Sequence, residues 1–129
     1  MKRSRHIFPL LILLFALPCI AEPLDLSKRE SLSPQEAASL QQDVTYLDVR
    51  STLEWLAGHV DGAIHIPYNK AARDFASAHP DRSVPVIPYC VSGGRAMYVV
   101  DALRKQGYTV VPVTNGGYRE LIANGLKYD

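Results

Sequence analysis

Residues 84–107, VPVIPYCVSGGRAMYVVDALRKQG, place an apolar stretch, a short glycine-rich loop and a helical pattern one after another. Residues 84–89 predict a strand, although each of its two prolines removes one hydrogen-bond donor from the sheet. From residue 94 or 95 to residue 106, apolar residues recur on one helical face, and Gly107 is a natural residue to end a helix. The sequence therefore predicts a strand, a loop that begins at Cys90, and a helix.

Strand and helix patterns alternate along the rest of the domain. Further helices are expected near residues 33–40, 51–56, 69–78 and 118–123, and further strands near 44–49, 63–67 and 109–113. Two helix starts, Ser33 with Glu36 and Ser51 with Glu54, have the spacing of a capping box. This alternation predicts an α/β domain with a central parallel sheet and helices on both faces. In such sheets ligands bind beyond the carboxyl ends of the strands, which is where Cys90 is expected.

The start of the chain has the pattern of a secretory signal peptide. Three Lys or Arg residues precede a nearly continuous apolar run over residues 7–20, and small residues at Cys19 and Ala21 fit a cleavage site before Glu22. A membrane anchor fits less well, because the run is short for a bilayer-spanning helix and contains two prolines. A lipid-modified Cys19 is weaker still, because a proline precedes it. The sequence predicts export to the periplasm.

This interpretation divides the chain into a cleaved signal peptide (residues 1–21), a flexible lead-in (22–31) and one domain (32–129) that has no membrane segment. The full chain has 14 Lys and Arg and 13 Asp and Glu. Without the three basic residues of the signal, 11 basic and 13 acidic residues remain, which gives a net charge of −2. We see no basic stripe, so the composition gives no support to a nucleic-acid partner. Cys90 would be the only cysteine of the mature chain.

The loop after the strand suits an anionic sulfur and an oxyanion substrate. Only the thiolate is a useful nucleophile, and a helix N-terminus directs its positive end and free N–H groups at the preceding loop. Glycines let the backbone curl so that successive N–H groups converge on one point. Cys90 and Arg95 are the candidate catalytic residues, and the guanidinium supplies a fixed charge and a planar donor fork. The candidate substrate-binding residues are Val91, Ser92, Gly93, Gly94 and Arg95.

Two chemistries use a Cys-loop-Arg cradle of this kind. Phosphate-ester and arsenate enzymes usually place five residues between Cys and Arg, whereas sulfur-transfer enzymes place four, and this chain has four. The smaller ring leaves less room for a tetrahedral phosphoryl group. The first aspartate after the loop, Asp101, lies inside the predicted helix, so it is not placed as a general acid. Loop length therefore favours sulfur transfer.

Residues 32 to about 126 resemble a rhodanese domain, the thiosulfate sulfurtransferase module. The motifs that carry the resemblance are Tyr46–Arg50 with Glu54, residues 58–63 (GHVDGA) with Ile66 and Pro67, the loop CVSGGR with its helix, and Asn115–Gly117. The resemblance implies that Cys90 cycles between thiolate and persulfide. It also implies that the loop N–H groups hold the persulfide and that Arg95 holds the donor oxyanion.

The expected partners are small molecules: a sulfur donor such as thiosulfate and a thiol or cyanide acceptor, with a redox or sulfur-accepting protein as a further candidate. No metal or organic cofactor is implied. Many family members carry a basic residue directly after the cysteine, where this chain has Val91, and this weakens the attraction for a dianionic donor. A low-turnover binding or sulfur-carrier module is therefore an open alternative, and an arsenate or phosphate-ester enzyme is a less favoured one.

Other polar residues are interpreted as structural. Asp48, Arg50 and Glu54 are expected to cap, turn and form a salt bridge beside the sheet, and Asn115–Gly117 is expected to be primarily a turn. The histidines His59, His65 and His79 do not show metal-ligand spacing with Cys90. In an oxidising compartment, we expect Cys90 to be exposed and to oxidise readily.

Overall fold

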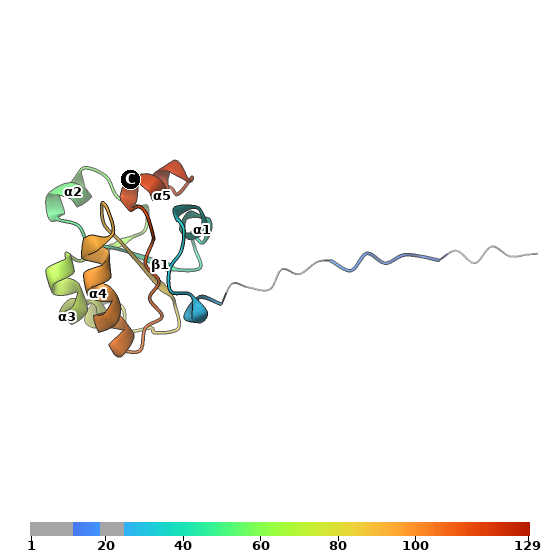
Figure 1. The fold of residues 1–129 in the computed structure, drawn as a ribbon, viewed down its shortest axis with the longest axis horizontal. Coiled ribbons are helices and arrows are strands. Elements are labelled where there is room, and N and C mark those ends of the chain that lie inside the picture. Colours follow the sequence, from blue (N-terminus) through green and yellow to red (C-terminus); the bar gives the residue numbers. More distant parts are fainter. Residues whose placement is uncertain (1–11, 19–24) are drawn as a thin grey trace, which may run out of the picture.

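The computed structural model describes residues 12–18 and 25–129. Residues 12–18 extend away from the domain with their side chains exposed (Figure 1). The rest of the predicted signal peptide and the first residues of the lead-in lie outside the described residues. Within the described part of the chain, we find no helix that combines the length and the apolar character needed to cross a membrane.

The helices and strands follow the predicted alternation. A short 3-10 helix, η1 (Leu26–Lys28), precedes α1 (Pro34–Ser39), β1 (Thr45–Asp48), α2 (Thr52–Leu56), β2 (Ile64–His65), α3 (Tyr68–Ala78), β3 (Val86–Tyr89), α4 (Gly94–Lys105) and α5 (Tyr118–Ala123). The η1 helix differs from the flexible lead-in that we expected. It forms because Leu26 is buried in the core and Asp25 accepts a hydrogen bond from the Ser27 N–H at the start of the turn.

The sheet is parallel, with the strand order β2-β1-β3. Strands β1 and β3 pair in register from Thr45 with Val86 to Asp48 with Tyr89, so both end at the same edge. Since Cys90 follows Tyr89 directly, the sheet places the cysteine at its carboxyl edge, as predicted. The two predicted capping boxes at Ser33 and Ser51 are both present and begin α1 and α2.

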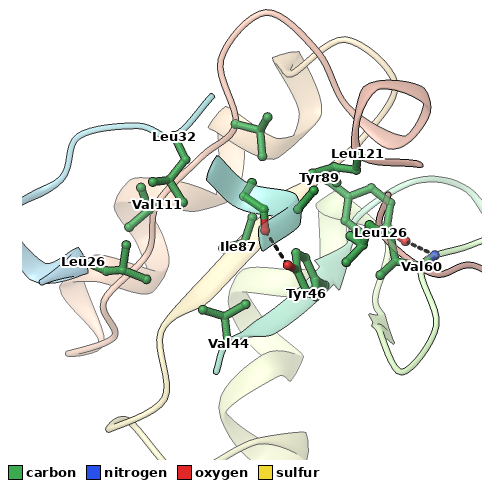
Figure 2. Packing of buried hydrophobic residues seen from close by; sticks show 13 residues of the cluster. Leu26, Leu32, Val44, Tyr46, Val60, Ile87, Tyr89, Val111, Leu121 and Leu126 are labelled. Carbon is green, nitrogen blue, oxygen red and sulfur yellow. Dashed lines mark hydrogen bonds between the residues drawn. The ribbon is translucent and has the colours of Figure 1, made fainter. Parts of the chain in front are cut away.

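Alternate residues of the strands enter two separate hydrophobic cores. On one face, Tyr46, Ile87 and Tyr89 pack with apolar residues of α1 and α5 (Figure 2). On the other face, Leu47 and Val86 pack with apolar residues of α3 and α4. The prediction of a parallel sheet with helices on both faces is therefore confirmed, and the two layers are visible in Figure 1.

The predicted strand at residues 109–113 is present only as two isolated bridges, one to Val86 and one to Leu32. The backbone N–H and carbonyl of Val86 both bond to this segment, at 2.8 and 3.0 Å. Residue 88 faces the same edge two positions later, but it is a proline and has no N–H to continue the ladder. Pro112 lacks the donor as well. The segment therefore lies beside the sheet without becoming a strand.

Candidate functional site

Cys90 begins a loop that folds back, so that a backbone N–H group of the loop lies next to the Cys90 sulfur. The backbone N–H of Gly93 donates a hydrogen bond to Cys90 Sγ over 3.0 Å. Gly93 has φ +100, in the left-handed region that favours glycine, and it is the N-cap residue directly before α4. We expected glycines to let the backbone curl at the start of the helix, so that successive N–H groups converge on one point. The structure shows one N–H group, that of Gly93, directed at the sulfur.

The Cys90 side chain is buried, contrary to the exposed thiol that we expected. Cys90 is 1% exposed and belongs to the same core as Leu47 and Val99, while the next residue, Val91, is 48% exposed. The difference arises because alternate residues at the end of β3 point to opposite sides of the sheet, and Cys90 takes the side that α4 covers. Ready oxidation by solvent oxidants is therefore not expected of this conformation.

The Asn115–Gly117 turn closes the loop from the other side. The N–H of Tyr118 donates to the Cys90 carbonyl over 2.8 Å. A Cβ atom on Gly117 would lie 2.0 Å from the Cys90 carbonyl oxygen and 2.6 Å from that of Val91, so only glycine fits. This turn does more than reverse the chain, because it packs against the backbone of the cysteine loop.

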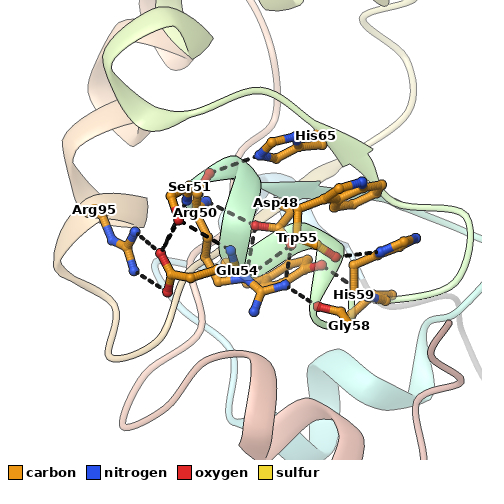
Figure 3. A network of polar contacts seen from close by, with 11 residues as sticks. Asp48, Arg50, Ser51, Glu54, Trp55, Gly58, His59, His65 and Arg95 are labelled. Carbon is orange, nitrogen blue, oxygen red and sulfur yellow. Dashed lines mark hydrogen bonds and ion pairs between the residues drawn. The ribbon is translucent and has the colours of Figure 1, made fainter.

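The side-chain hydrogen bonds of Arg95 go to Glu54 and not to the sulfur. Arg95 Nη1 donates to Glu54 Oε1 over 2.6 Å, and Nη2 donates to Oε2 over 3.0 Å (Figure 3). The hydrogen bonds from Arg95, followed by those from Ser51, lower the pKa of Glu54 to about 2. The pKa of Arg95 is raised, first by the Glu54 hydrogen bond and, more weakly, by the charge of Cys90. The guanidinium thus lies close enough to Cys90 for an electrostatic interaction, while both of its terminal nitrogens bond to a carboxylate.

Asp48 and Arg50 form a second ion pair, which is buried. Their side chains are 0% and 5% exposed, and the closest contact joins Arg50 Nη2 to Asp48 Oδ2 over 2.6 Å. The same Nη2 donates to the Gly58 carbonyl over 2.7 Å, and the guanidinium lies over the Tyr118 ring at 4.3 Å. The structural role expected for Asp48 and Arg50 agrees with this geometry. Glu54 also caps α2 as expected, but its pairing with Arg95 was not foreseen.

Two histidines near the site, His59 and His65, stack against the ring of Trp55. The Trp55 ring stacks on His59 with centroids 3.4 Å apart and faces His65 at 4.9 Å. Each histidine also has one ring nitrogen at hydrogen-bond distance from a backbone carbonyl, that of Trp55 for His59 and that of Arg50 for His65. Over residues 12–18 and 25–129, no three His, Cys, Asp or Glu side chains form a group suited to a metal ion.

Two surface pockets lie apart from the cysteine loop. The larger, about 270 Å³, is lined by residues 26–30, 104 and 108–110. The smaller, about 140 Å³, is lined by residues 41–42, 46, 61 and 126–127. Neither pocket is lined by a residue of the cysteine loop.

Two contacts of the site could not be predicted from the sequence motifs alone. Glu54 is paired with an arginine 41 positions later, and Gly117 touches a loop 27 positions earlier. The sequence carried a partial signal for each: a capping box at Glu54 and a glycine pair before α5. Neither signal names the partner, because both contacts depend on how α2 and α5 pack around the sheet edge.

Known proteins are similar to this chain in sequence and in fold. The family model described as "Rhodanese-like domain" matches residues 33–124. A thiosulfate sulfurtransferase of Arabidopsis thaliana (number 16, chloroplastic) is 36% identical over 91 residues, which cover 63% of this chain and 76% of the relative. A tRNA uridine(34) hydroxylase of Chlamydia muridarum is 34% identical over 88% of this chain, but the match spans only 36% of that protein.

Solved structures give the same fold. The crystal structure of a rhodanese-related protein from Thermoplasma volcanium superposes with a TM-score of 0.68 and covers 78% of this chain and 97% of the other. Its sequence identity of 24% shows the fold alone. The family model, which spans most of the domain from α1 to α5, decides the classification: this chain belongs to the rhodanese-like domain family.

Proposed function

We propose that this protein is a sulfurtransferase that carries sulfur as a persulfide on Cys90. The observation that carries the proposal is the Gly93 N–H bound to Cys90 Sγ at the carboxyl edge of the sheet. A backbone donor at this position stabilises negative charge on the sulfur, and a thiolate is the form that attacks a sulfur donor. The relatives named as thiosulfate sulfurtransferases support the same reaction class.

The reaction consists of two balanced nucleophilic steps. The Cys90 thiolate attacks the outer sulfur of thiosulfate, the S–S bond of the donor breaks, and sulfite leaves with the electron pair. A thiol or cyanide then attacks the terminal sulfur of the persulfide and restores the thiolate. No external oxidant or reductant takes part. The loop N–H groups from Val91 to Arg95 are proposed to hold the persulfide, and Arg95 to attract the anionic donor.

Sulfur loading of Cys90 tests the proposal directly. The full chain is incubated with thiosulfate, digested without reductant and analysed by mass spectrometry, which separates the peptides of Cys90 and Cys19. We expect one added sulfur atom on Cys90, which added cyanide removes as thiocyanate. Cys90→Ser should lose transfer while keeping the fold. A wild-type Cys90 that stays unmodified under an excess of several donors would refute the proposal.

A low-turnover sulfur carrier is the second candidate. It is favoured by the burial of Cys90 and by the occupation of Arg95 by Glu54, since both hinder a small anionic donor from reaching the sulfur. Steady-state kinetics with several donors and acceptors separate the two candidates. Repeated turnover removes the carrier, whereas stable loading of a single sulfur without turnover supports it.

Export to the periplasm is a separate proposal. It is supported by the basic start, the apolar run over residues 7–20 and the small residues before Glu22. Expression of the full chain in a bacterium, followed by cell fractionation and N-terminal sequencing, tests it. We expect the protein in the periplasmic fraction with Glu22 at its N-terminus; a cytoplasmic protein that still begins with Met1 would contradict the proposal.

A further inference from the structure

The carboxylate of Glu54 is held firmly against the arginine of the cysteine loop. Besides the two hydrogen bonds from Arg95, Oε1 accepts from the Ser51 N–H and Oγ over 3.2 and 3.0 Å. These bonds favour the ionised carboxylate, which is consistent with a pKa of about 2. At neutral pH, the Glu54 carboxylate therefore already balances the positive charge of Arg95.

Two exposed apolar side chains lie close to Cys90 and Arg95 along the chain. Val91, at the position directly after Cys90, is 48% exposed. Tyr98 lies one turn after Arg95 on the same side of α4, is 67% exposed, and meets the Tyr68 ring edge-on with centroids 5.4 Å apart. Neither side chain adds a positive charge that would attract an anionic donor.

We propose that Glu54 determines which sulfur donors the Cys90 site accepts: it disfavours doubly charged donors such as thiosulfate relative to singly charged donors with an apolar leaving group. The inference rests on the proposed sulfurtransferase activity. A dianion gains little from an arginine that is already paired and is repelled by the Glu54 charge, whereas a monoanion meets less repulsion and gains apolar contact. Glu54 acts here through Arg95 and is a specificity residue, not a catalytic one.

Benzenethiosulfonate is the matched probe for this test, because it delivers its outer sulfur by the same step as thiosulfate. The Cys90 thiolate attacks that sulfur, the S–S bond breaks, and benzenesulfinate leaves with the electron pair. One negative charge of thiosulfate is replaced by a phenyl ring. The two donors differ in intrinsic reactivity, so the informative quantity is how the ratio of their kcat/KM values changes between variants.

The decisive variant is Glu54→Gln, which keeps the size of the side chain and removes its charge. We expect the kcat/KM for thiosulfate to rise about fivefold relative to that for benzenethiosulfonate, the scale of one partly exposed charge interaction. Glu36→Gln is the control: Glu36 also completes a capping box and pairs with an arginine, Arg29, at 2.7 Å, but on α1. Its donor ratio should equal that of the wild type.

The outcomes separate this inference from the proposed function. A rise in the thiosulfate ratio in Glu54→Gln alone supports the inference. An unchanged ratio, with both donors still loading Cys90, overturns it, and so does an equal loss for both donors, which indicates a purely structural role for Glu54. If mass spectrometry finds no sulfur on wild-type Cys90 from either donor, the proposed function itself fails, and the specificity role falls with it.

Discussion

Gly117 should not accept even a methyl group, because its backbone lies directly against the loop of the candidate nucleophile. In Gly117→Ala, the new Cβ would lie 2.0 Å from the carbonyl oxygen of Cys90 and 2.8 Å from its carbonyl carbon. A close carbon–oxygen contact is normally about 3.3 Å or more, so the two segments must separate by about 1 Å. The φ of Gly117 is −158°, outside the positive-φ region that favours glycine, and the expected effect is calculated from the close contact.

The magnitude follows from two terms. Forcing a methyl group into a closely packed site costs about 1–3 kcal/mol. Separating the segments also weakens the bond from the Tyr118 N–H to the Cys90 carbonyl, which contributes about 1 kcal/mol. We therefore expect Gly117→Ala to lower the free energy of unfolding by about 2–4 kcal/mol and to reduce sulfur loading of Cys90.

Urea denaturation followed by the fluorescence of Trp55, the single tryptophan of the chain, measures the stability term, and mass spectrometry measures loading. Gly94→Ala is the matched stability control, because a Cβ there meets no atom within 4 Å and the backbone is helical. It should change the unfolding free energy by less than about 1 kcal/mol, and in the stabilising direction. If Gly117→Ala stays within about 0.5 kcal/mol of the wild type and loads normally, the close approach inferred here is wrong.

The two ion pairs of the site should respond differently to perturbation. Asp48→Ala leaves the buried Arg50 charge without its partner and should cost about 3–5 kcal/mol in urea denaturation; a cost below about 1 kcal/mol would show that the pair is not buried as described. The stabilisation from the Glu54–Arg95 pair should depend on pH. Because the folded-state pKa of Glu54 is lowered to about 2, its stabilisation is present above pH 4.5 and is lost as the pH falls toward 2. The pair is about one-third exposed, so the loss should be about 1 kcal/mol or less. It is measured as the stability difference between wild type and Glu54→Gln near pH 6 and near pH 3; a difference that grows in acid would contradict the assignment.

Local signals in the sequence were sufficient for most helices and for the position of Cys90. The capping boxes at Ser33 and Ser51 depend on residues three positions apart, so the sequence contains the whole interaction. The left-handed Gly93 is similarly local, since glycine tolerates that conformation without help from the rest of the fold. These features were predicted because their physical causes lie within one turn of the chain.

The misjudged features depend on distant partners. Residues 109–113 have the composition of a strand, but the strand fails because Pro88, on the neighbouring strand, cannot donate to it. The burial of Cys90 follows from which side of the sheet α4 covers, and no residue near the cysteine fixes that choice. The pairing of Arg95 with Glu54 was not predicted, because the sequence shows the charge of Arg95 but not the carboxylate that balances it.

The contacts that hold the cysteine loop show why both local sequence signals and contacts between distant residues are needed to understand this site. One side is fixed by Glu54, whose carboxylate joins the start of α2 to the start of α4 through bonds to Ser51 and Arg95. The other side is fixed by Gly117, which lets α5 start against the Cys90 carbonyl. A loop that is held from both sides keeps the Gly93 N–H aimed at the sulfur whether or not a donor is present. Such preorganisation is what stabilises developing negative charge without reorganisation during the reaction. The same loop leaves Cys90 only 1% exposed, so under the proposed function one segment both stabilises charge on the sulfur and limits the access of donors to it.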